Sequence, residues 1–363
     1  MATTLLSIAG GLALLVLGGD WLVRGASRIA LRAGVAPLVV GLTIVAFGTS
    51  SPELVVSVTA ALEGNAEIAV ANVVGSNVFN VLFILGLCAV LAPLAVASQM
   101  VRREVPIMIG TSLLLLAFAW DGRLVAWESA VLLAGIVAYT AGAVVLARRE
   151  AQEVKDEFAA APGARPAGSW AGNVAFVAGG LVLLVLGARW LVAGAVAVAK
   201  TLGVSDTVIG LTIVAAGTSL PEVAASVVAT LRGERDIAVG NVVGSNIYNI
   251  LAILGVSGLV AGPGGLPVSD GLLRFDVPVM IAVAVATLPI VFTGRRIDRW
   301  EGWLFLSTYA AYVGYLVLDA RGHDAAPSLA QGLAFFVLPL VAVTLGVGVW
   351  RQLRRDRAAA TGT

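Results

Sequence analysis

Apolar stretches of about twenty residues, separated by short polar segments, recur along the whole chain. An α-helix rises 1.5 Å per residue, so about 20 apolar residues cross the roughly 30 Å hydrocarbon core of a bilayer. The pattern predicts an all-α membrane protein surrounded by lipid, with two sets of five spans and an eleventh apolar helix. We expect the spans at about 3–27, 36–62, 67–93, 104–120 and 125–147, then at 171–199, 207–231, 236–261, 275–293 and 300–318, with the eleventh helix at 327–350.

Polar segments divide these spans into units. The expected organisation is a first unit at 1–147, a hydrophilic cytoplasmic linker at 148–170, a second unit at 171–320, the extra helix at 327–350 and a basic cytoplasmic tail at 351–363. The N-terminus has no basic segment and no clean small-residue cleavage site, so we expect a first span there and no signal peptide.

The two units are copies of one sequence. A shift of 169 residues places Gly48-Thr-Ser-Ser-Pro-Glu53 on Gly217-Thr-Ser-Leu-Pro-Glu222, and Asn72-Val-Val-Gly-Ser-Asn77 on Asn241-Val-Val-Gly-Ser-Asn246. From residue 39 to residue 87, 31 of 49 positions are identical at this shift. A biased apolar composition produces scattered matches, but it does not align Asn, Glu, Pro and Ser at one offset. The chain therefore contains an internal duplication.

An odd number of spans in each copy requires the second copy to insert upside down. With the N-terminus outside and the C-terminus inside, nearly all Arg and Lys residues in the loops fall on the cytoplasmic side, as the positive-inside rule expects. The exceptions are Arg123, Lys200, Arg274 and Arg321. Equivalent loops also differ in charge, because Glu63 in the first copy becomes Arg232 in the second. We therefore predict inverted-topology repeats.

Composition excludes several functions. Hydrophobic residues make up 59% of the chain and charged residues 12%, whereas soluble domains carry roughly a quarter charged residues. The net charge of +1 argues against nucleic acid as a partner. The single cysteine, Cys88, lies in an apolar run, and the single histidine, His323, is interpreted as a loop residue. We expect no enzyme activity, no cofactor and no protein partner. Scarce lysine (only Lys155 and Lys200) is typical of a GC-rich prokaryotic genome, which would place the chain in the cytoplasmic (inner) membrane.

Each copy places a Pro-Glu pair in the middle of an apolar span. A carboxylate at the bilayer midplane costs at least about 2.5–3.5 kcal/mol, so Glu53 and Glu222 are expected to be functional. Pro52 and Pro221 remove a backbone donor and interrupt the helix. We expect the carbonyls near Ala46 and Ala215 to be freed as ligands there, as in the broken helices of secondary transporters. Hydroxyls that lie close in sequence are Thr49, Ser50, Thr218 and Ser219.

The span after each Pro-Glu adds further oxygens on one helix face. Ser76 and Asn80, like Ser245 and Asn249, are separated by four residues. Together the two copies supply carboxylates, amides, hydroxyls and carbonyls, and neither imidazole nor thiolate. An all-oxygen site suits hard cations such as Ca2+. Two carboxylates balance the charge of one Ca2+ or of two Na+, so one site could exchange these ions.

Other intramembrane charges are interpreted as structural. Asp20 and Arg24 are four residues apart on the first span, where an ion pair or a snorkelling side chain is expected. The position equivalent to Asp20 in the second copy is Arg189, so the repeat does not preserve this acid. A structural role is the competing interpretation of Glu53 and Glu222 also. It is weakened by their equivalent positions and shared Thr, Ser and Asn neighbours.

At these residues the sequence resembles the cation/Ca2+ exchanger superfamily, in its Na+/Ca2+ exchanger-like branch. The resemblance rests on 48–53 with 72–80 and on 217–222 with 241–249. It implies a ten-helix inverted-repeat fold and antiport of Ca2+ against Na+ by alternating access. It also implies that Glu53 and Glu222 are shared ligands, that Thr49, Thr218, Ser76, Ser245 and the carbonyls of Ala46 and Ala215 complete the ion sites, and that Ser50, Ser219, Asn80 and Asn249 lie beside them.

Several alternatives remain open at this point. Some members of the superfamily, including K+-dependent ones, carry Asp where this chain has Asn249, which argues against K+ co-transport. The H+/Ca2+ branch typically has Gly-Asn-Ala before its Glu, and this chain does not, although proton coupling stays an alternative. A passive cation channel is the third possibility, disfavoured by half-sites on broken helices.

Overall fold

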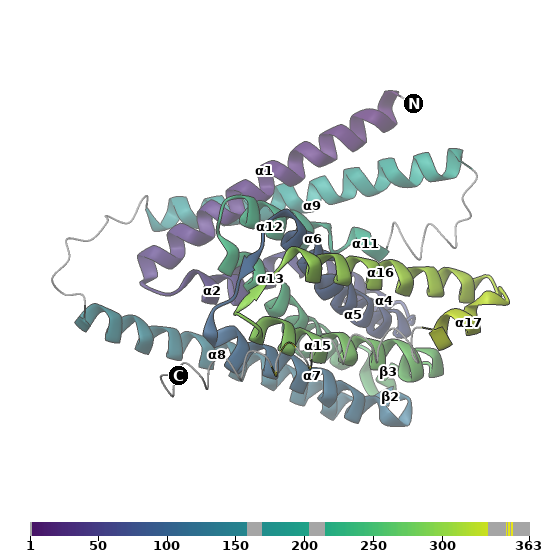
Figure 1. Ribbon diagram of the computed structural model, residues 1–363. Helices are drawn as coiled ribbons and strands as arrows, with labels where there is room; N and C mark the ends of the chain where they lie inside the picture. Colours follow the sequence, from purple (N-terminus) through teal and green to yellow (C-terminus); the bar gives the residue numbers. More distant parts are fainter. Residues whose placement is uncertain are drawn as a thin grey trace.

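The structure, a computed structural model, describes residues 2–157, 169–202 and 215–332, together with positions 346, 348 and 350. The described part is almost wholly helical, with four strands of two residues each (Figure 1). The first repeat contains α1 (Ala2–Ala33), α2 (Pro37–Val40), η1 (Gly41–Val45), α3 (Ala46–Thr49), α4 (Ser51–Leu62), α5 (Glu67–Phe79), η2 (Asn80–Leu85), α6 (Gly86–Leu91), β1 (Leu94–Ala95), η3 (Met100–Glu104), α7 (Val105–Phe118), η4 (Ala119–Asp121), β2 (Arg123–Leu124) and α8 (Ala126–Glu157).

The described part of the second repeat follows a similar order, with a 3-10 turn before its first strand and one further helix at its end. It contains α9 (Trp170–Thr201), α11 (Ala215–Gly217), α12 (Leu220–Leu231), α13 (Arg235–Tyr248), η6 (Asn249–Ile253), α14 (Leu254–Val260), η7 (Gly262–Gly264), β3 (Leu266–Pro267), η8 (Leu272–Asp276), α15 (Val277–Phe292), β4 (Arg296–Ile297), α16 (Arg299–Ala320) and α17 (Ala325–Gly332).

Within the described ranges, eight helices are long and apolar enough to span a membrane. Pro37–Thr49 and Ser51–Leu62 meet at a 43° bend and form a ninth span. These nine correspond to nine of the ten spans expected in the two sets. The remaining one, expected at 207–231, is described only from α11 onward, with α12 as its apolar second part. The eleventh expected helix, 327–350, lies mostly outside the described residues.

The helix of the fifth span is longer than expected. α8 continues through Glu157, ten residues into the segment predicted to be the linker. This segment consists mainly of Arg, Glu, Gln, Lys and Ala, which are strong helix formers and continue the helix beyond its apolar part. Residues 158–168 of the predicted linker lie outside the described part, so its boundaries stay a prediction.

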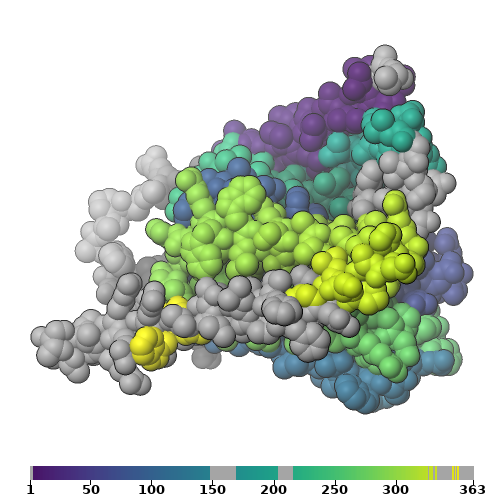
Figure 2. Space-filling view, turned by 45° about the vertical axis from the view of Figure 1, so that its right-hand side comes forward, coloured from purple at the N-terminus to yellow at the C-terminus, as the bar shows by residue number. Residues whose placement is uncertain are grey.

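Two long spans form the centre of the molecule. The span Glu67–Leu91 is 78% buried and its counterpart Arg235–Val260 is 94% buried, so these helices are enclosed by protein. By contrast, α1 and α9 are buried for 33% and 22% of their spans. They lie side by side across one side of the bundle, and Figure 2 shows α1 (purple) at that edge of the molecule. The two central spans are therefore enclosed by other helices, whereas α1 and α9 lie at the periphery.

Glycines allow α1 and α9 to approach closely. A Cβ atom on Gly18 would lie 2.8 Å from the carbonyl oxygen of Gly180 and 2.8 Å from the backbone nitrogen of Leu184. The equivalent glycine of the second repeat, Gly187, would meet the Gly11 carbonyl at 2.8 Å. Backbone-to-backbone contact of this kind is how small residues hold membrane helices together. The contacts are related by the 169-residue offset, as a two-fold axis requires.

Two short strand pairs reveal the inversion of the repeats. β1 pairs with β4, and β2 pairs with β3, both antiparallel. The spanning helix α7 separates β1 from β2, so the two pairs lie at opposite ends of the bundle. β1 is equivalent to β3 in the repeat, yet it lies at the other end. Equivalent elements at opposite membrane faces are the signature of an inverted repeat, as the loop charges predicted.

Candidate ion-binding site

Both glutamates lie at breaks in their helices. α3 ends at Thr49, Ser50 leaves the helical conformation (φ −78°, ψ 6°), and α4 begins at Ser51 with Pro52 in its first turn. The second repeat ends α11 at Gly217, passes through Ser219 (φ −88°, ψ 7°) and starts α12 with Pro221. Proline fits the first turn because its missing N–H would have no intrahelical partner there. Each break therefore places a glutamate in the first turn of the following helix, in the protein interior.

Serines from opposite repeats hold the two carboxylates. The hydroxyl of Ser219 donates to Glu53 Oε1 at 2.7 Å, and the hydroxyl of Ser50 donates to Glu222 Oε1 at 2.9 Å. Both glutamates are 1% exposed. No Arg or Lys is buried anywhere in the described residues. The two negative charges thus share one interior region without a buried cationic side chain.

Asparagines on the central helices fix the glutamate backbones. Asn72 Nδ2 donates to the Glu53 carbonyl at 3.2 Å and to Ser57 Oγ at 3.0 Å. In the second repeat, Asn241 Nδ2 donates to Ser226 Oγ at 2.9 Å and to the Glu222 carbonyl at 3.5 Å. The hydroxyl of Thr49 also donates to Asn241 Oδ1 at 3.1 Å. Each Glu-bearing helix is therefore attached to the central helix of its own repeat.

Four asparagines join the two central helices to each other. Asn77 Nδ2 donates to the Asn246 carbonyl at 3.2 Å, and Asn246 Nδ2 returns a 3.4 Å bond to the Asn77 carbonyl. Asn80 Nδ2 donates to Asn246 Oδ1, and Asn249 Nδ2 donates to Asn77 Oδ1, both at 3.0 Å. The reciprocal pattern places these residues around the pseudo-two-fold axis. Asn80 and Asn249 take part in these bonds through Nδ2, and their Oδ1 atoms are left out of the asparagine network.

Five buried oxygens of this region have no hydrogen-bond partner. They are Glu53 Oε2, Glu222 Oε2, Asn80 Oδ1, Asn249 Oδ1 and Ser245 Oγ. A buried polar atom left unpaired costs about 1–3 kcal/mol, so a cluster of five requires an explanation. All five are oxygens, and four of them are acceptors only. This donor set fits a hard cation, which coordinates carboxylate, amide and hydroxyl oxygens.

The other buried acids of the spans are satisfied by protein groups. Glu104 accepts hydrogen bonds from Gln99, Arg103 and Tyr139. Glu128 and Glu301 accept from the backbone at the starts of α8 and α16, where they cap their helices. No cluster of three His, Cys, Asp or Glu side chains occurs within the described ranges. Glu53 and Glu222 therefore differ from the structural acids by each having a buried, unpaired oxygen.

The structure brings most of the expected site residues together, with one correction. The Ala46 carbonyl still accepts from the backbone N–H of Ser50 at 3.0 Å. It is not freed in this conformation, contrary to expectation, because Pro52 removes the donor for Gly48, four residues earlier, and not for Ala46. Ala215 is the first residue of α11. The ligand roles of both carbonyls stay predictions.

The equivalent hydroxyls do not have equivalent surroundings. Ser76 Oγ lies 3.3 Å from Ser219 Oγ, whereas Ser245 Oγ is unpaired. Thr49 is fully buried, but Thr218 is partly exposed and lines a cavity of about 440 Å³. The conformation is thus asymmetric although the sequence is nearly symmetric.

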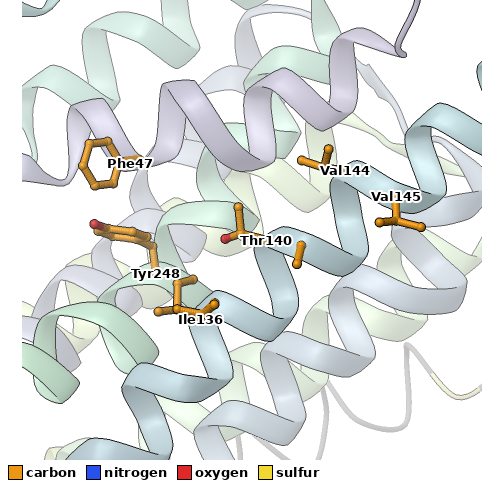
Figure 3. A pocket seen from close by; sticks show the side chains of 8 residues that line it. Phe47, Ile136, Thr140, Val144, Val145 and Tyr248 are labelled. Atoms are coloured by element: carbon orange, nitrogen blue, oxygen red, sulfur yellow. The ribbon is translucent and has the colours of Figure 1, made fainter.

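The cavity beside Thr218 lies between α4 and α9. Its lining comprises Ser51, Pro52, Val55 and Val56 from α4, Val185, Ala188, Arg189, Val192 and Ala193 from α9, and Gly217 with Thr218. Neither glutamate lines the cavity, but Thr218, one of the expected site residues, does, so the cavity reaches the edge of the expected site. A second pocket of about 640 Å³ is apolar and borders Phe47, whose ring packs edge-on against Tyr248; Figure 3 shows both rings near α8 side chains Ile136 and Thr140. It offers no carboxylate to a cation.

Asn72, Asn77, Asn241 and Asn246 were not predicted as site residues. The signal for them was present in the sequence, because all four match at the 169-residue offset. The matches establish the duplication, but the sequence alone gives no reason why an amide recurs at these positions. The structure shows the reason, which is hydrogen bonding within and between the repeats.

Comparisons with known proteins agree with this architecture. A family model described as "Sodium/calcium exchanger protein" matches residues 3–145 and 172–318. The chain is 35% identical over 336 residues to the sodium/calcium exchanger MaX1 of Methanosarcina acetivorans, covering 84% of this chain and 95% of MaX1. It is 36% identical over 290 residues to the inner membrane protein YrbG of Escherichia coli, covering 79% of this chain and 88% of YrbG.

A solved structure shares the fold. The sodium-calcium exchanger NCX_Mj superposes with a TM-score of 0.74 at 30% sequence identity, covering 87% of this chain and 99% of that one. Because the family model matches both repeats and the fold is shared with NCX_Mj, the chain belongs to the sodium/calcium exchanger family of membrane antiporters.

Proposed function

We propose that the protein exchanges Ca2+ for Na+ at one site formed by Glu53 and Glu222. The observation that carries the proposal is the pair of buried carboxylates, each held through one oxygen by a serine of the other repeat and unpaired at the other oxygen. Two carboxylates neutralise one Ca2+ or two Na+, so either cargo can fill the site without a large uncompensated charge. The names of MaX1 and NCX_Mj support Na+ as the counter-ion.

The neutral oxygens complete the proposed site. Asn80 and Asn249 would coordinate through Oδ1, and Ser245 through its hydroxyl, because these atoms are buried and unpaired. Ser50, Ser219 and Ser76 lie in the hydrogen-bond network of the carboxylates. Thr49, Thr218 and the carbonyls of Ala46 and Ala215 would serve ions along the entry path. Ca2+ accepts six to eight oxygens in flexible geometry, which such a mixed set can provide.

Alternating access is supported by the asymmetry of the structure. The cavity between α4 and α9 reaches the edge of the site from one direction. The symmetry-related helices α12 and α1 instead pack against each other, since a Cβ on Gly19 would lie 3.0 Å from Val228 Cγ2 and 3.1 Å from the Ala224 carbonyl. If α9 closed on α4 while α1 moved away from α12, the proposed site would open to the opposite side of the membrane. In an inverted repeat, each of the two states can use the contacts that the other repeat makes in the opposite state.

The test measures the counter-ion directly. Purified protein is reconstituted into liposomes, and radiolabelled Ca2+ uptake is compared between vesicles loaded with Na+ and vesicles loaded with choline. We expect uptake only with internal Na+. Uptake driven by a pH gradient and indifferent to Na+ would indicate an H+/Ca2+ antiporter, and non-saturating uptake without any counter-ion would indicate a channel.

Site variants connect the flux to the carboxylates. Glu53→Gln and Glu222→Gln should each abolish exchange while the protein remains monodisperse in detergent. Glu67→Gln, which removes an exposed carboxylate from the first turn of α5, is the matched control and should exchange normally. Full activity in both site variants would refute the site assignment.

We further propose the cytoplasmic membrane as the location, with the N-terminus outside and the C-terminus inside. The asymmetry of Arg and Lys in the loops supports this orientation, and the inner-membrane relative YrbG supports the compartment. Reporter fusions after residue 66 and after residue 234 should report opposite sides of the membrane.

A further inference from the structure

One ion cluster holds α1 against α12 at the packed side of the site. Asp20 on α1 forms an ion pair with Arg24 at 2.9 Å on the same helix. Asp20 also pairs with Arg232, the residue at the C-terminal end of α12. Gly19 packs on α12 one residue away. The Asp20–Arg232 pair therefore joins a peripheral helix to a Glu-bearing helix where the two are in contact.

The equivalent positions of the other repeat carry the opposite charges. With the 169-residue offset, Asp20 corresponds to Arg189 on α9, and Arg232 corresponds to Glu63 at the end of α4. One pair has its acid, Asp20, on the peripheral helix and its base at the helix end. The other pair has its base, Arg189, on the peripheral helix and its acid at the helix end. Independent drift would rarely change both members of a pair and keep them complementary.

Arg189 and Glu63, unlike their counterparts, form no ion pair with each other in this structure. Both side chains are described and exposed, and no ion pair joins them. Arg189 lines the cavity that separates α9 from α4. Glu63 lies at the C-terminal end of its helix, where the helix dipole disfavours a carboxylate unless a cation is close. The negative charge of Glu63 would gain such a cation, Arg189, if α9 closed on α4.

We propose that Asp20–Arg232 and Glu63–Arg189 are two alternating ionic latches, one for each access state. The inference rests on the proposed alternating exchange. In the present state, Asp20 and Arg232 hold α1 on α12 while the α4–α9 side is open. In the opposite state, α9 closes the cavity, Arg189 reaches Glu63, and Asp20 separates from Arg232.

The test uses two cysteine reporters in a Cys88→Ala background, with the protein in lipid nanodiscs. Val55→Cys lies in the wall of the open cavity. Ala224→Cys is its symmetry equivalent at the packed α1–α12 contact. Both are labelled with a charged, water-soluble thiol reagent, and the ratio of the Val55→Cys rate to the Ala224→Cys rate measures the balance between the two states.

Breaking each latch should shift this ratio in opposite directions. Arg189→Gln destabilises the closed-cavity state and should raise the ratio, whereas Arg232→Gln should lower it. Exposed ion pairs are weak, so we expect changes of about two- to fivefold. Glu63→Gln should reproduce the effect of Arg189→Gln and serves as the second variant should that one fail to fold. The double swap of Glu63→Arg with Arg189→Glu should restore the original ratio.

Arg235→Gln, three residues beyond Arg232, is the matched control and should leave the ratio unchanged. Shifts in the same direction for Arg189→Gln and Arg232→Gln, absence of any shift, or failure of the double swap to restore the ratio would each overturn the proposal. The labelling requires neither a Na+ nor a Ca2+ gradient. A protein that failed the counter-ion test could therefore still show the opposite shifts, and the two ideas fail separately.

Discussion

Ser50 in the first repeat donates a 2.9 Å hydrogen bond to Glu222 in the second. The symmetry equivalent, Ser219 to Glu53, measures 2.7 Å. Neither half of the duplication can orient its own carboxylate, because the donor comes from the other half. The proposed site therefore requires both broken helices, one from each repeat.

Removing one of these donors should weaken Ca2+ binding without abolishing transport. A hydrogen bond to a charged group contributes about 1.5–3 kcal/mol, so Ser219→Ala should raise the Ca2+ concentration for half-maximal exchange roughly tenfold or more. Ser51→Ala is the control, since the Ser51 hydroxyl donates to the Phe47 carbonyl of α3 and to neither glutamate. Equal values for the two variants would contradict the orienting role. The measurement is initial Ca2+ uptake against Ca2+ concentration.

Bound Ca2+ should stabilise the fold through the same carboxylates. A ligand present at 100 times its Kd adds about 2.7 kcal/mol to the free energy of unfolding. The wild-type protein in detergent should unfold at a higher temperature in Ca2+ than in a chelator, and Glu222→Gln should lose this difference. Glu67→Gln should keep it. A Ca2+-dependent shift that survives in Glu222→Gln would place the ion elsewhere.

A third carboxylate at position 249 should change both stability and ion preference. Asn249 donates to Asn77 Oδ1, and an aspartate cannot donate while ionised, so Asn249→Asp places two acceptors against each other in a buried position. We expect lower thermal stability in the absence of cations and recovery when a monovalent ion neutralises the charge. Melting temperatures in Na+, K+ and choline would show this. Asn80→Asp is the symmetry-related comparison, and identical melting in all three salts would contradict the expectation.

Much of this fold was predictable because the membrane imposes strong rules. Apolar length identified the spans, and matched polar residues at one offset identified the repeat. The charge change from Glu63 to Arg232 predicted the inversion that the β1–β4 and β2–β3 pairs show. These features depend on local sequence and on the bilayer.

The details of the site were less predictable, because they depend on contacts between residues far apart in the chain. Nothing in the sequence indicates that Ser219 would face Glu53 of the other repeat, or that Asn77 and Asn246 would exchange bonds across the axis. The expected release of the Ala46 carbonyl was wrong because the loss of a donor at Pro52 affects Gly48. The sequence also could not predict that Thr49 is buried while Thr218 lines a cavity, because a nearly symmetric repeat does not specify which of the two threonines is exposed.

The glycine contact between α1 and α9 predicts a position-specific cost. Gly18→Ala would place a Cβ 2.8 Å from backbone atoms of Gly180 and Leu184, which cannot move aside as a flexible side chain could. Overpacking of this kind costs about 1–3 kcal/mol, so Gly18→Ala should lower the melting temperature. Gly142→Ala on α8 is the control, because nothing lies within 4 Å of its Cβ and alanine stabilises a helix over glycine by about 1 kcal/mol. The two substitutions should therefore move the melting temperature in opposite directions. A stabilising Gly18→Ala would mean that α1 and α9 do not pack through these backbones.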